Sequence, residues 1–316
     1  MKKLIVVLTV TLVALFIVSY TSLDATITQL FSTQDLKVIS SEVPLDTDGD
    51  GFSDWFEENI AGYDPNIPND RYIILFEYHP EEGLNTIADS SANFFKEGGV
   101  PESNIYLLKQ EQAIRPNLQA AIKEVAQKAD ENDLVFLGID THGCTDWISS
   151  HPSYTEEWLE KKHRGELGPE DPPHPGISYA DIDEWLDKIK AKAVIVRIMA
   201  CYCETALPRL KDGPCPRIVF VHSAGEFISA LGQDPDYAAK VDMKYGNNNG
   251  YVSLAEIGNW KNNEPRGWKD NEREEGKPGD GFWNGQSWLE KMGFSVMSDT
   301  SGIADQIYLT DYKIPG

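Results

Sequence analysis

Residues 193–201 read AVIVRIMAC, and this stretch decides the fold. Only Arg197 interrupts the apolar run, and the three residues 194–196 are all β-branched. Such a composition is typical of a central strand in a parallel sheet that is covered on both faces. Reactive groups in these sheets lie at the carboxyl ends of the strands, which is where Cys201 stands.

A second stretch of the same character covers residues 133–141 and runs directly into His142 and Gly143. Parallel strands present their carboxyl ends at one edge of the sheet. We therefore expect the two strands to be neighbours that bring the imidazole of His142 and the thiol of Cys201 to the same edge.

The chain around these two strands alternates between strand and helix patterns. Helices are expected from about 86 to 96, from 116 to 129 and from Ser178, whose spacing to Asp181 matches a capping box. The other strands are expected at 71–78, 105–108 and 217–222, and residues 303–308 are expected to turn from helix to strand at the sheet edge. This alternation predicts an α/β fold, a three-layer sandwich with a mostly parallel central sheet.

Composition limits the classes of function. The chain has 316 residues, 41% of them hydrophobic, which suffices for the core of one large domain. The net charge of −23 argues against nucleic acid as a partner, because phosphates would be repelled.

The first 22 residues predict a signal peptide or a membrane anchor. Lys2 and Lys3 precede an apolar segment at 4–20, which is just long enough to span a bilayer. Residues 23–44 are polar and aperiodic and are interpreted as a linker or pro-segment. Either reading of the first segment places the rest of the chain outside the cytoplasm, secreted or at the cell surface.

Residues 45–70 are expected to form a calcium-binding loop module. From Asp46 to Glu57 the spacing matches the twelve-residue loop of calcium proteins, with Gly51 at the sixth position, where a sharp turn is needed. The expected Ca²⁺ ligands are Asp46, Asp48, Asp50, Asp54, Glu57 and the backbone carbonyl of Phe52. The following residues resemble the tail of thrombospondin type 3 calcium repeats, which makes Asp64, Asn66 and Asp70 candidates for further ligands.

The sequence of two other segments supports less specific predictions. Residues 245–256 resemble a second calcium loop in which Tyr245 replaces the first carboxylate, so we expect weak binding or none. Residues 144–177 form an insertion after the His142 strand and are interpreted as a flap that shapes a pocket.

Four cysteines leave the disulfide pattern open. They are Cys144, Cys201, Cys203 and Cys215. Outside the cytoplasm cysteines usually pair, and both Cys203–Cys215 and Cys144–Cys203 are compatible with a free Cys201.

A free thiol at Cys201 beside an imidazole predicts nucleophilic catalysis. His142 would act as the general base and then protonate the leaving amine. The backbone N–H groups of Gly143 and Cys201 would hold the oxyanion, and each donor of this kind contributes about 3 kcal/mol.

The order apolar strand, His142-Gly143 and, 59 residues after the histidine, apolar strand, Ala200-Cys201 resembles the caspase and legumain superfamily of cysteine peptidases. Leu207-Pro208 and the run 222–226 add to the resemblance, which covers roughly residues 71–310. It implies a caspase-like peptidase domain at 71–316, a cysteine endopeptidase acting on peptide or protein substrates. His142 and Cys201 would be its dyad, and Met199 and Ser223 would line its substrate pocket.

Departures from the family pattern leave two alternatives. Met199 stands where relatives carry glutamine, glutamate or aspartate, and the Arg-His pair of legumains is missing near residues 85–86. A catalytically inactive, calcium-binding surface protein on the same scaffold is therefore one alternative. A metal site formed by Cys201, Cys203 and His222 is the other.

Overall fold

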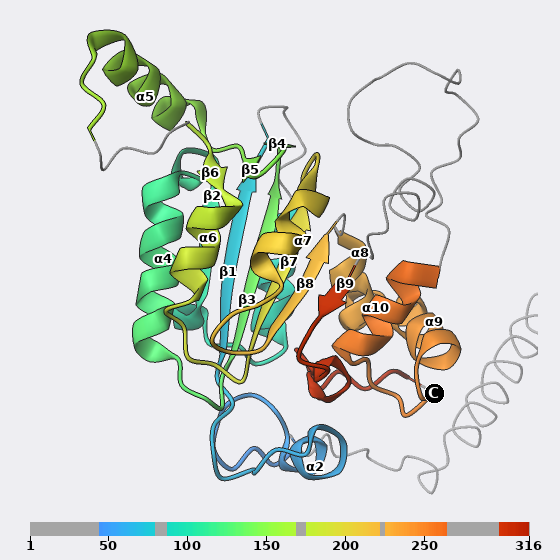
Figure 1. Ribbon diagram of the computed structural model, residues 1–316. Coiled ribbons are helices and arrows are strands. Elements are labelled where there is room, and N and C mark those ends of the chain that lie inside the picture. Colours follow the sequence, from blue (N-terminus) through green and yellow to red (C-terminus); the bar gives the residue numbers. More distant parts are fainter. Residues whose placement is uncertain (1–43, 80–86, 169–174, 222–224, 264–296, 316) are drawn as a thin grey trace, which may run out of the picture. The chain divides into compact units, whose positions relative to one another are not determined.

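The computed structural model describes residues 44–79, 87–168, 175–221, 225–263 and 297–315 (Figure 1). The predicted signal peptide or anchor, and the linker as far as residue 43, lie outside these residues. Residues 46–316 form one compact unit, so the acidic loop at 46–57 belongs to the same unit as the strands and helices that follow it. No helix within the described ranges combines the length and the apolar character that crossing a membrane requires.

The core is a six-stranded sheet in the order β2-β1-β3-β7-β8-β9. Its first five strands are parallel, and only β9 runs antiparallel to its neighbour. The strands are β1 (Arg71–Tyr78), β2 (Ile105–Lys109), β3 (Leu134–Thr141), β7 (Ala193–Met199), β8 (Arg217–Val221) and β9 (Met297–Asp299). The predicted adjacency of the two central strands is confirmed, because β3 pairs directly with β7.

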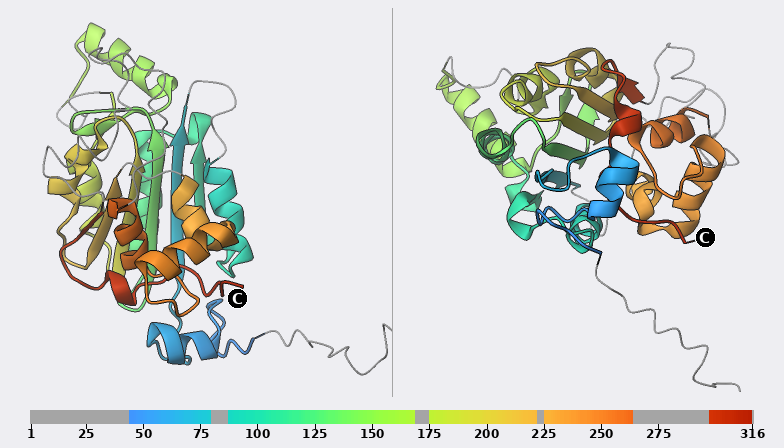
Figure 2. Two further views of the ribbon diagram at one scale, coloured as in Figure 1. Left: turned by 90° about the vertical axis from the view of Figure 1, so that its right-hand side faces the viewer. Right: turned by 90° about the horizontal axis from the view of Figure 1, so that it is seen from below.

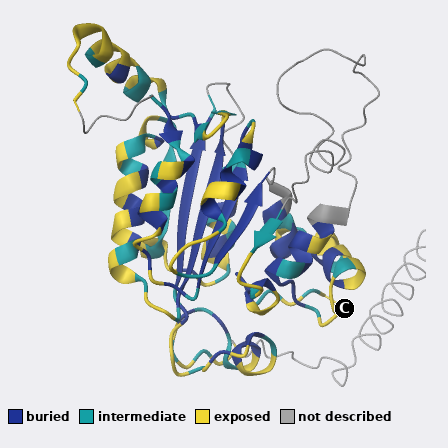
Figure 3. Ribbon diagram, in the orientation of Figure 1, coloured by how far each residue is buried: buried dark blue, intermediate teal, exposed yellow. Residues whose placement is uncertain are grey.

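Helices cover both faces of this sheet (Figures 1 and 2). Alternate residues of each strand point to opposite sides, and every residue of β1 and β3 is buried (Figure 3). One face packs on α4 (Arg115–Lys128), α6 (Tyr179–Leu186) and α7 (Leu207–Leu210). The other packs on α3 (Ile87–Glu97), α8 (Gly225–Ile228), α9 (Pro235–Tyr245) and α10 (Leu254–Asn263). The predicted three-layer α/β sandwich is thus confirmed, in the arrangement expected of a caspase-like fold.

Short elements complete the unit. Single 3₁₀ turns occur at Glu102–Asn104, Gln110–Gln112, Cys203–Ala206 and Ala304–Gln306, and a π-helical turn follows α8 at Ser229–Gln233. The capping box is confirmed at α6, where Ser178 and Asp181 exchange side-chain and backbone hydrogen bonds.

The expected helix-to-strand segment at 303–308 is wrong in its second half. The edge strand is β9, and after the turn at 304–306 the chain does not join the sheet. Its carbonyl groups bond elsewhere: that of Ile307 accepts from the N–H of Leu254, and that of Leu309 accepts from Arg71.

The insertion after β3 has structure of its own. A second sheet joins β4 (Gly143–Cys144), β5 (Trp147–Ile148) and β6 (Ile177–Ser178), and α5 (Pro152–Arg164) lies between β5 and β6 in the chain. Because β4 begins at Gly143, this small sheet starts beside the catalytic candidate His142. Residues 169–174 of the insertion lie outside the described residues.

The acidic loop closes the opposite end of the sheet, at the start of β1. At its C-terminal end the loop runs into α2 (Asp54–Phe56), and a π-helical turn follows at Glu57–Ala61. Five aromatic side chains and one alanine form a separate hydrophobic cluster here: Phe52, Phe56, Ala61, Tyr63, Tyr251 and Tyr308. The buried Arg71 fixes the loop to β1, because its guanidinium donates to the carbonyl of Asp50 and packs 3.9 Å from the centre of the Phe52 ring.

Candidate functional site

The register of three adjacent strands lines up the ends that carry reactive side chains. Glu77 of β1 is paired with Asp140 of β3, and Asp140 is paired with Met199 of β7. Two residues beyond this row come, in the same order, His79, His142 and Cys201. Neighbouring parallel strands lie about 4.8 Å apart, so the three residues follow adjacent strand ends at one rim of the sheet.

The backbone after β3 is pressed against the backbone after β7. A Cβ atom on Gly143 would lie 2.6 Å from the carbonyl oxygen of Cys201 and 3.0 Å from the Cβ of Ala200. Real Cβ atoms do not approach backbone so closely, so this position requires glycine. The close contact brings the Gly143 backbone next to the Cys201 backbone, and the oxyanion hole stays a prediction.

The residue after the thiol has a strained backbone. Tyr202 has φ 59° and ψ 21°, the left-handed region that residues with a Cβ rarely adopt. Its carbonyl oxygen accepts from both the N–H and the hydroxyl of Thr205. The Thr205 hydroxyl in turn accepts from the N–H of Asp146 in the β4–β5 turn. These bonds hold the turn after Cys201, and nothing in the sequence pattern had indicated it.

A second imidazole adjoins His142. The ring of His79 lies edge to face with the ring of His142, with 5.6 Å between the centroids. Nε2 of His79 lies 2.8 Å from Oδ1 of Asp140, whose side chain is only 4% exposed. The sequence reading missed both residues. The available signals were a charged residue near the end of an otherwise apolar strand and a histidine directly after the β1 strand.

The predicted pocket residues have different outcomes. Met199 ends β7, is half-buried and pairs with Asp140 in the sheet register. Ser223 lies outside the described residues. The carbonyl of His142 accepts from the N–H of Ser149, so the small sheet is tied to the catalytic candidate itself.

None of the four cysteines forms a disulfide, so neither of the two bridges that the sequence left open is present. Cys203 is fully buried in the core on the α6 side of the sheet, with Sγ 3.8 Å from the carbonyl oxygen of Ile198. Cys144 is exposed on β4, and Cys215 is half-buried before β8. The thiol of Cys201 is thus not locked in a disulfide. The alternative metal site also includes His222, which lies outside the described residues.

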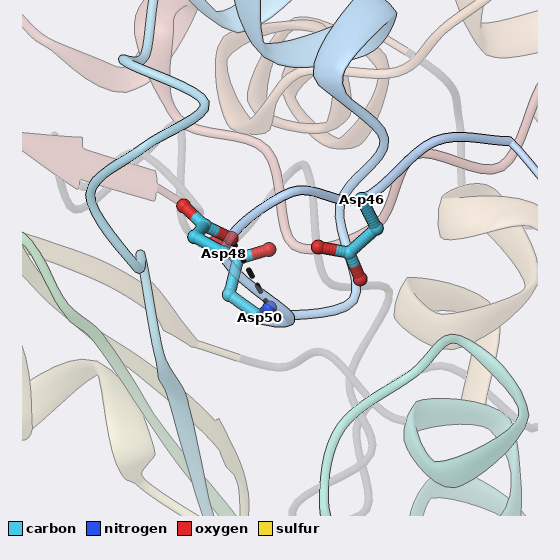
Figure 4. A group of neighbouring side chains, drawn as sticks. All are labelled: Asp46, Asp48 and Asp50. Carbon is cyan, nitrogen blue, oxygen red and sulfur yellow. Dashed lines mark hydrogen bonds between the residues drawn. The ribbon is translucent and has the colours of Figure 1, made fainter.

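The acidic loop gathers three carboxylates. One oxygen each of Asp46, Asp48 and Asp50 lies within 4.8 Å of the others, a spacing that suits a metal ion (Figure 4). Backbone N–H groups shape the loop: those of Gly49 and Gly51 donate to Asp46, and that of Asp50 donates to Asp48. Gly51 has φ +87°, as the predicted sharp turn requires.

Glu57 is the most unusual group near this cluster. Its side chain is fully buried, and neither carboxylate oxygen has a hydrogen-bond partner. Burial, together with the nearby charges of Asp50, Asp48, Asp54 and Asp46, raises the pKa of Glu57 to about 8. A buried carboxylate without a partner is costly, and a cation at the cluster would supply the missing partner.

The structure gives the other predicted ligands different roles. Both oxygens of Asp54 accept from Thr47, so this residue closes the loop and does not join the three-carboxylate cluster. Asp64 accepts from the N–H of Asn66 in a local turn and does not join the cluster. Burial raises the pKa of Asp50 to about 6, although hydrogen bonds from the N–H groups of Phe52 and Asn69 and the charge of Arg71 act to lower it.

The second loop, at 245–256, is better formed than its sequence indicates. The carboxylate of Asp242, three residues before Tyr245, accepts from the N–H groups of Asn249 and Gly250. Glu256 accepts from the N–H groups of Asn247 and Ser253. Asp242 therefore accepts the backbone hydrogen bonds that the missing first carboxylate would accept, as Asp46 does in the first loop. Weak or absent calcium binding here stays a prediction.

Comparison with known proteins adds no assignment, because neither a scan of protein-family models nor a search of curated proteins finds a match to this chain.

Proposed function

We propose that the protein is a cysteine endopeptidase that uses His142 and Cys201 as a dyad. One observation carries the proposal: both residues stand two positions beyond a directly paired register row, Asp140 and Met199, on adjacent parallel strands. Two observations add support: Cys201 forms no disulfide, and Gly143 packs closely against its carbonyl. The resemblance to caspases and legumains rests on the same residues.

The dyad would act by nucleophilic acyl transfer. His142 takes the proton of the Cys201 thiol, and the sulfur attacks the carbonyl carbon of the scissile peptide bond. The protonated imidazole then gives its proton to the leaving amine, and the C–N bond breaks to leave a thioester. Water, deprotonated by His142, attacks the thioester, releases the carboxylic acid and restores the thiol.

Stabilisation of the tetrahedral oxyanion falls to backbone N–H groups. Those of Gly143 and Cys201 would be the donors at the two strand ends, and hydrogen bonds aimed at the oxyanion would stabilise it. The half-buried Met199 at the end of β7 would make the neighbouring substrate pocket apolar.

We further propose that the acidic loop binds Ca²⁺. Asp46, Asp48, Asp50 and Glu57 would supply carboxylate oxygens, and the backbone carbonyl of Phe52 would supply one more. The orphaned, fully buried oxygens of Glu57 are the observation that supports an ion here. All-oxygen ligation with a final glutamate suits calcium. The ion would stabilise the loop and take no part in the peptidase reaction.

The dyad is tested by thiol reactivity and by peptide hydrolysis in the full chain. Cys201 should be alkylated by iodoacetamide faster than the exposed Cys144, measured on each peptide by mass spectrometry. His142→Ala should slow Cys201 but not Cys144, and Cys201→Ala should abolish cleavage of a peptide library. Equal alkylation of the two cysteines in the wild type, with no cleavage, would rule out the proposal.

The second candidate is an inactive, calcium-binding surface protein on the same scaffold. The specific observation in its favour is Met199, which replaces the polar pocket residue of the active relatives. It predicts a calcium-dependent rise in melting temperature together with an unreactive Cys201. Under either candidate the −23 charge disfavours nucleic acid, and the N-terminal 22 residues favour a location outside the cytoplasm or at the cell surface.

A further inference from the structure

We infer that His79, held by the buried Asp140, is a positioning residue that orients the ring of His142. The inference rests on the proposed dyad and extends it by a third and a fourth residue. It starts from the row of strand ends, in which His79, His142 and Cys201 follow β1, β3 and β7. In this order His79 flanks His142 on the side away from Cys201.

The ring of a histidine that acts as general base at a strand end must be held in its orientation by neighbouring residues. Cys–His hydrolysis requires the imidazole within hydrogen-bond reach of the thiol, and a displacement of about 1 Å costs about a hundredfold in rate. Hydrolases of this type commonly use a third group to orient the imidazole. The edge-to-face contact between His79 and His142, with centroids 5.6 Å apart, provides such a group through packing.

His79 is itself held in place. Asp140 only accepts hydrogen bonds as a carboxylate, so His79 donates from Nε2 to Oδ1 across 2.8 Å. The second carboxylate oxygen of Asp140 is buried without a partner, which leaves His79 as the partner on which Asp140 depends. The His79 side chain is only 15% exposed, so its ring has little room to rotate.

The surrounding charges explain why a histidine occupies this place. Glu77 is fully buried next to Asp140 in the register, and both point to the α3 face of the sheet. Oε1 of Glu77 accepts from the N–H of Ile87 at the start of α3, while Oε2 has no partner. Lys109 of β2 lies opposite Glu77 in the strand register, but its ammonium group forms an ion pair with Asp89. His79 thus places a hydrogen-bonding ring beside a pair of buried acids, and the same ring packs against that of His142.

The test compares His79→Ala with His151→Ala in the full-length protein. His151 is a matched control, because its ring also packs edge to face on an aromatic ring near this rim, that of Tyr78, without being placed against His142. We expect His79→Ala to lower the ratio of Cys201 to Cys144 alkylation, and kcat on a cleaved peptide, by about tenfold or more, with KM within about twofold. His151→Ala should leave all three unchanged.

Further variants separate a positioning role from a structural one. His79→Gln keeps a donor for Asp140 but lacks the ring; it should be as slow as His79→Ala and carries the test if His79→Ala fails to fold. His79→Phe keeps the ring contact and should restore part of the rate. A folded His79→Ala or His79→Gln with wild-type alkylation and kcat would overturn the inference while the dyad stands. A wild-type Cys201 no more reactive than Cys144, and insensitive to His142→Ala, would refute the dyad and this inference together.

Discussion

Replacing Glu57 by glutamine should stabilise the calcium-free protein and reduce the stabilisation that calcium adds. In the calcium-free protein Glu57 is fully buried and neither oxygen has a partner, and four aspartates raise its pKa further, to about 8. An unfolded glutamate has a pKa of about 4.3. The folded state therefore keeps a proton that the unfolded state loses between these two values, and wild-type stability falls as the pH rises through that window.

The size of the effect follows from the same pKa values. Each pH unit inside the window costs about 1.4 kcal/mol for one carboxyl, so at pH 7 Glu57 lowers the stability of the calcium-free protein by about 4 kcal/mol. A buried glutamine carries its own desolvation cost, so we expect Glu57→Gln to gain about 2 kcal/mol. That corresponds to a melting temperature about 4–8 °C higher. With calcium bound, the variant lacks one charged, bidentate ligand and should lose about 1–3 kcal/mol of the ligand-induced stabilisation.

Thermal unfolding by circular dichroism at pH 5 and pH 7, in EGTA and in excess calcium, measures these terms. Glu58→Gln is the matched control, because Glu58 is the next residue and is exposed. It should shift neither curve by more than about 0.5 kcal/mol. A Glu57→Gln protein that melts lower than the wild type in EGTA would refute the buried-carboxylate reasoning. An unchanged calcium-induced shift would remove Glu57 from the ligand set.

Three other perturbations have defined outcomes. Gly143→Ala places a Cβ 2.6 Å from the Cys201 carbonyl oxygen and should lower kcat of peptide hydrolysis by about a hundredfold in a folded protein; unchanged kcat would mean that the two backbones separate freely. Tyr202→Gly removes a left-handed strain and should raise stability by about 1 kcal/mol in urea unfolding, whereas a loss would show that the exposed ring contributes more than the strain costs. Burial lowers the pKa of Lys192 to about 8, so its cost is complete below pH 8 and disappears as the pH rises to the unfolded value; Lys192→Met should therefore melt higher than the wild type at pH 7 and lose this advantage by about pH 10, and a constant difference would contradict the titration.

The sequence predicted correctly those features whose physical cause lies in residues close together along the chain. The β-branched run at 194–196 needs burial on both faces, and β7 provides it between β3 and β8. The capping box at Ser178 depends on residues three apart, so its signal is complete in the sequence. The acidic loop is likewise a single continuous motif, and its first three aspartates converge as the spacing predicts.

The sequence did not predict contacts between segments that are far apart along the chain. Asp140 and His79 are 61 residues apart, and only the register of β1 with β3 brings them together. Asp242 supports the second loop from the preceding helix, outside the twelve positions in which a carboxylate is sought. The edge strand was misplaced because residues 297–299 have one apolar residue in three, whereas residues 303–308 have four in six and resemble a strand more. The structure pairs the former with β8, while other segments bond to the carbonyl of Ile307.

Strand β1 links the two proposed sites and also separates them. Its first residue, Arg71, donates to the carbonyl of Asp50 in the acidic loop, whereas His79 follows its last residue at the opposite end. Eight residues of extended chain span about 26 Å, which is too far for an ion at the loop to influence the dyad through its field in salt solution. Arg71 is fully buried and also donates to the carbonyl of Leu309, so loss of loop order would loosen both the start of β1 and the C-terminal segment. Calcium should therefore change the fraction of folded molecules and leave kcat of the folded ones unaltered.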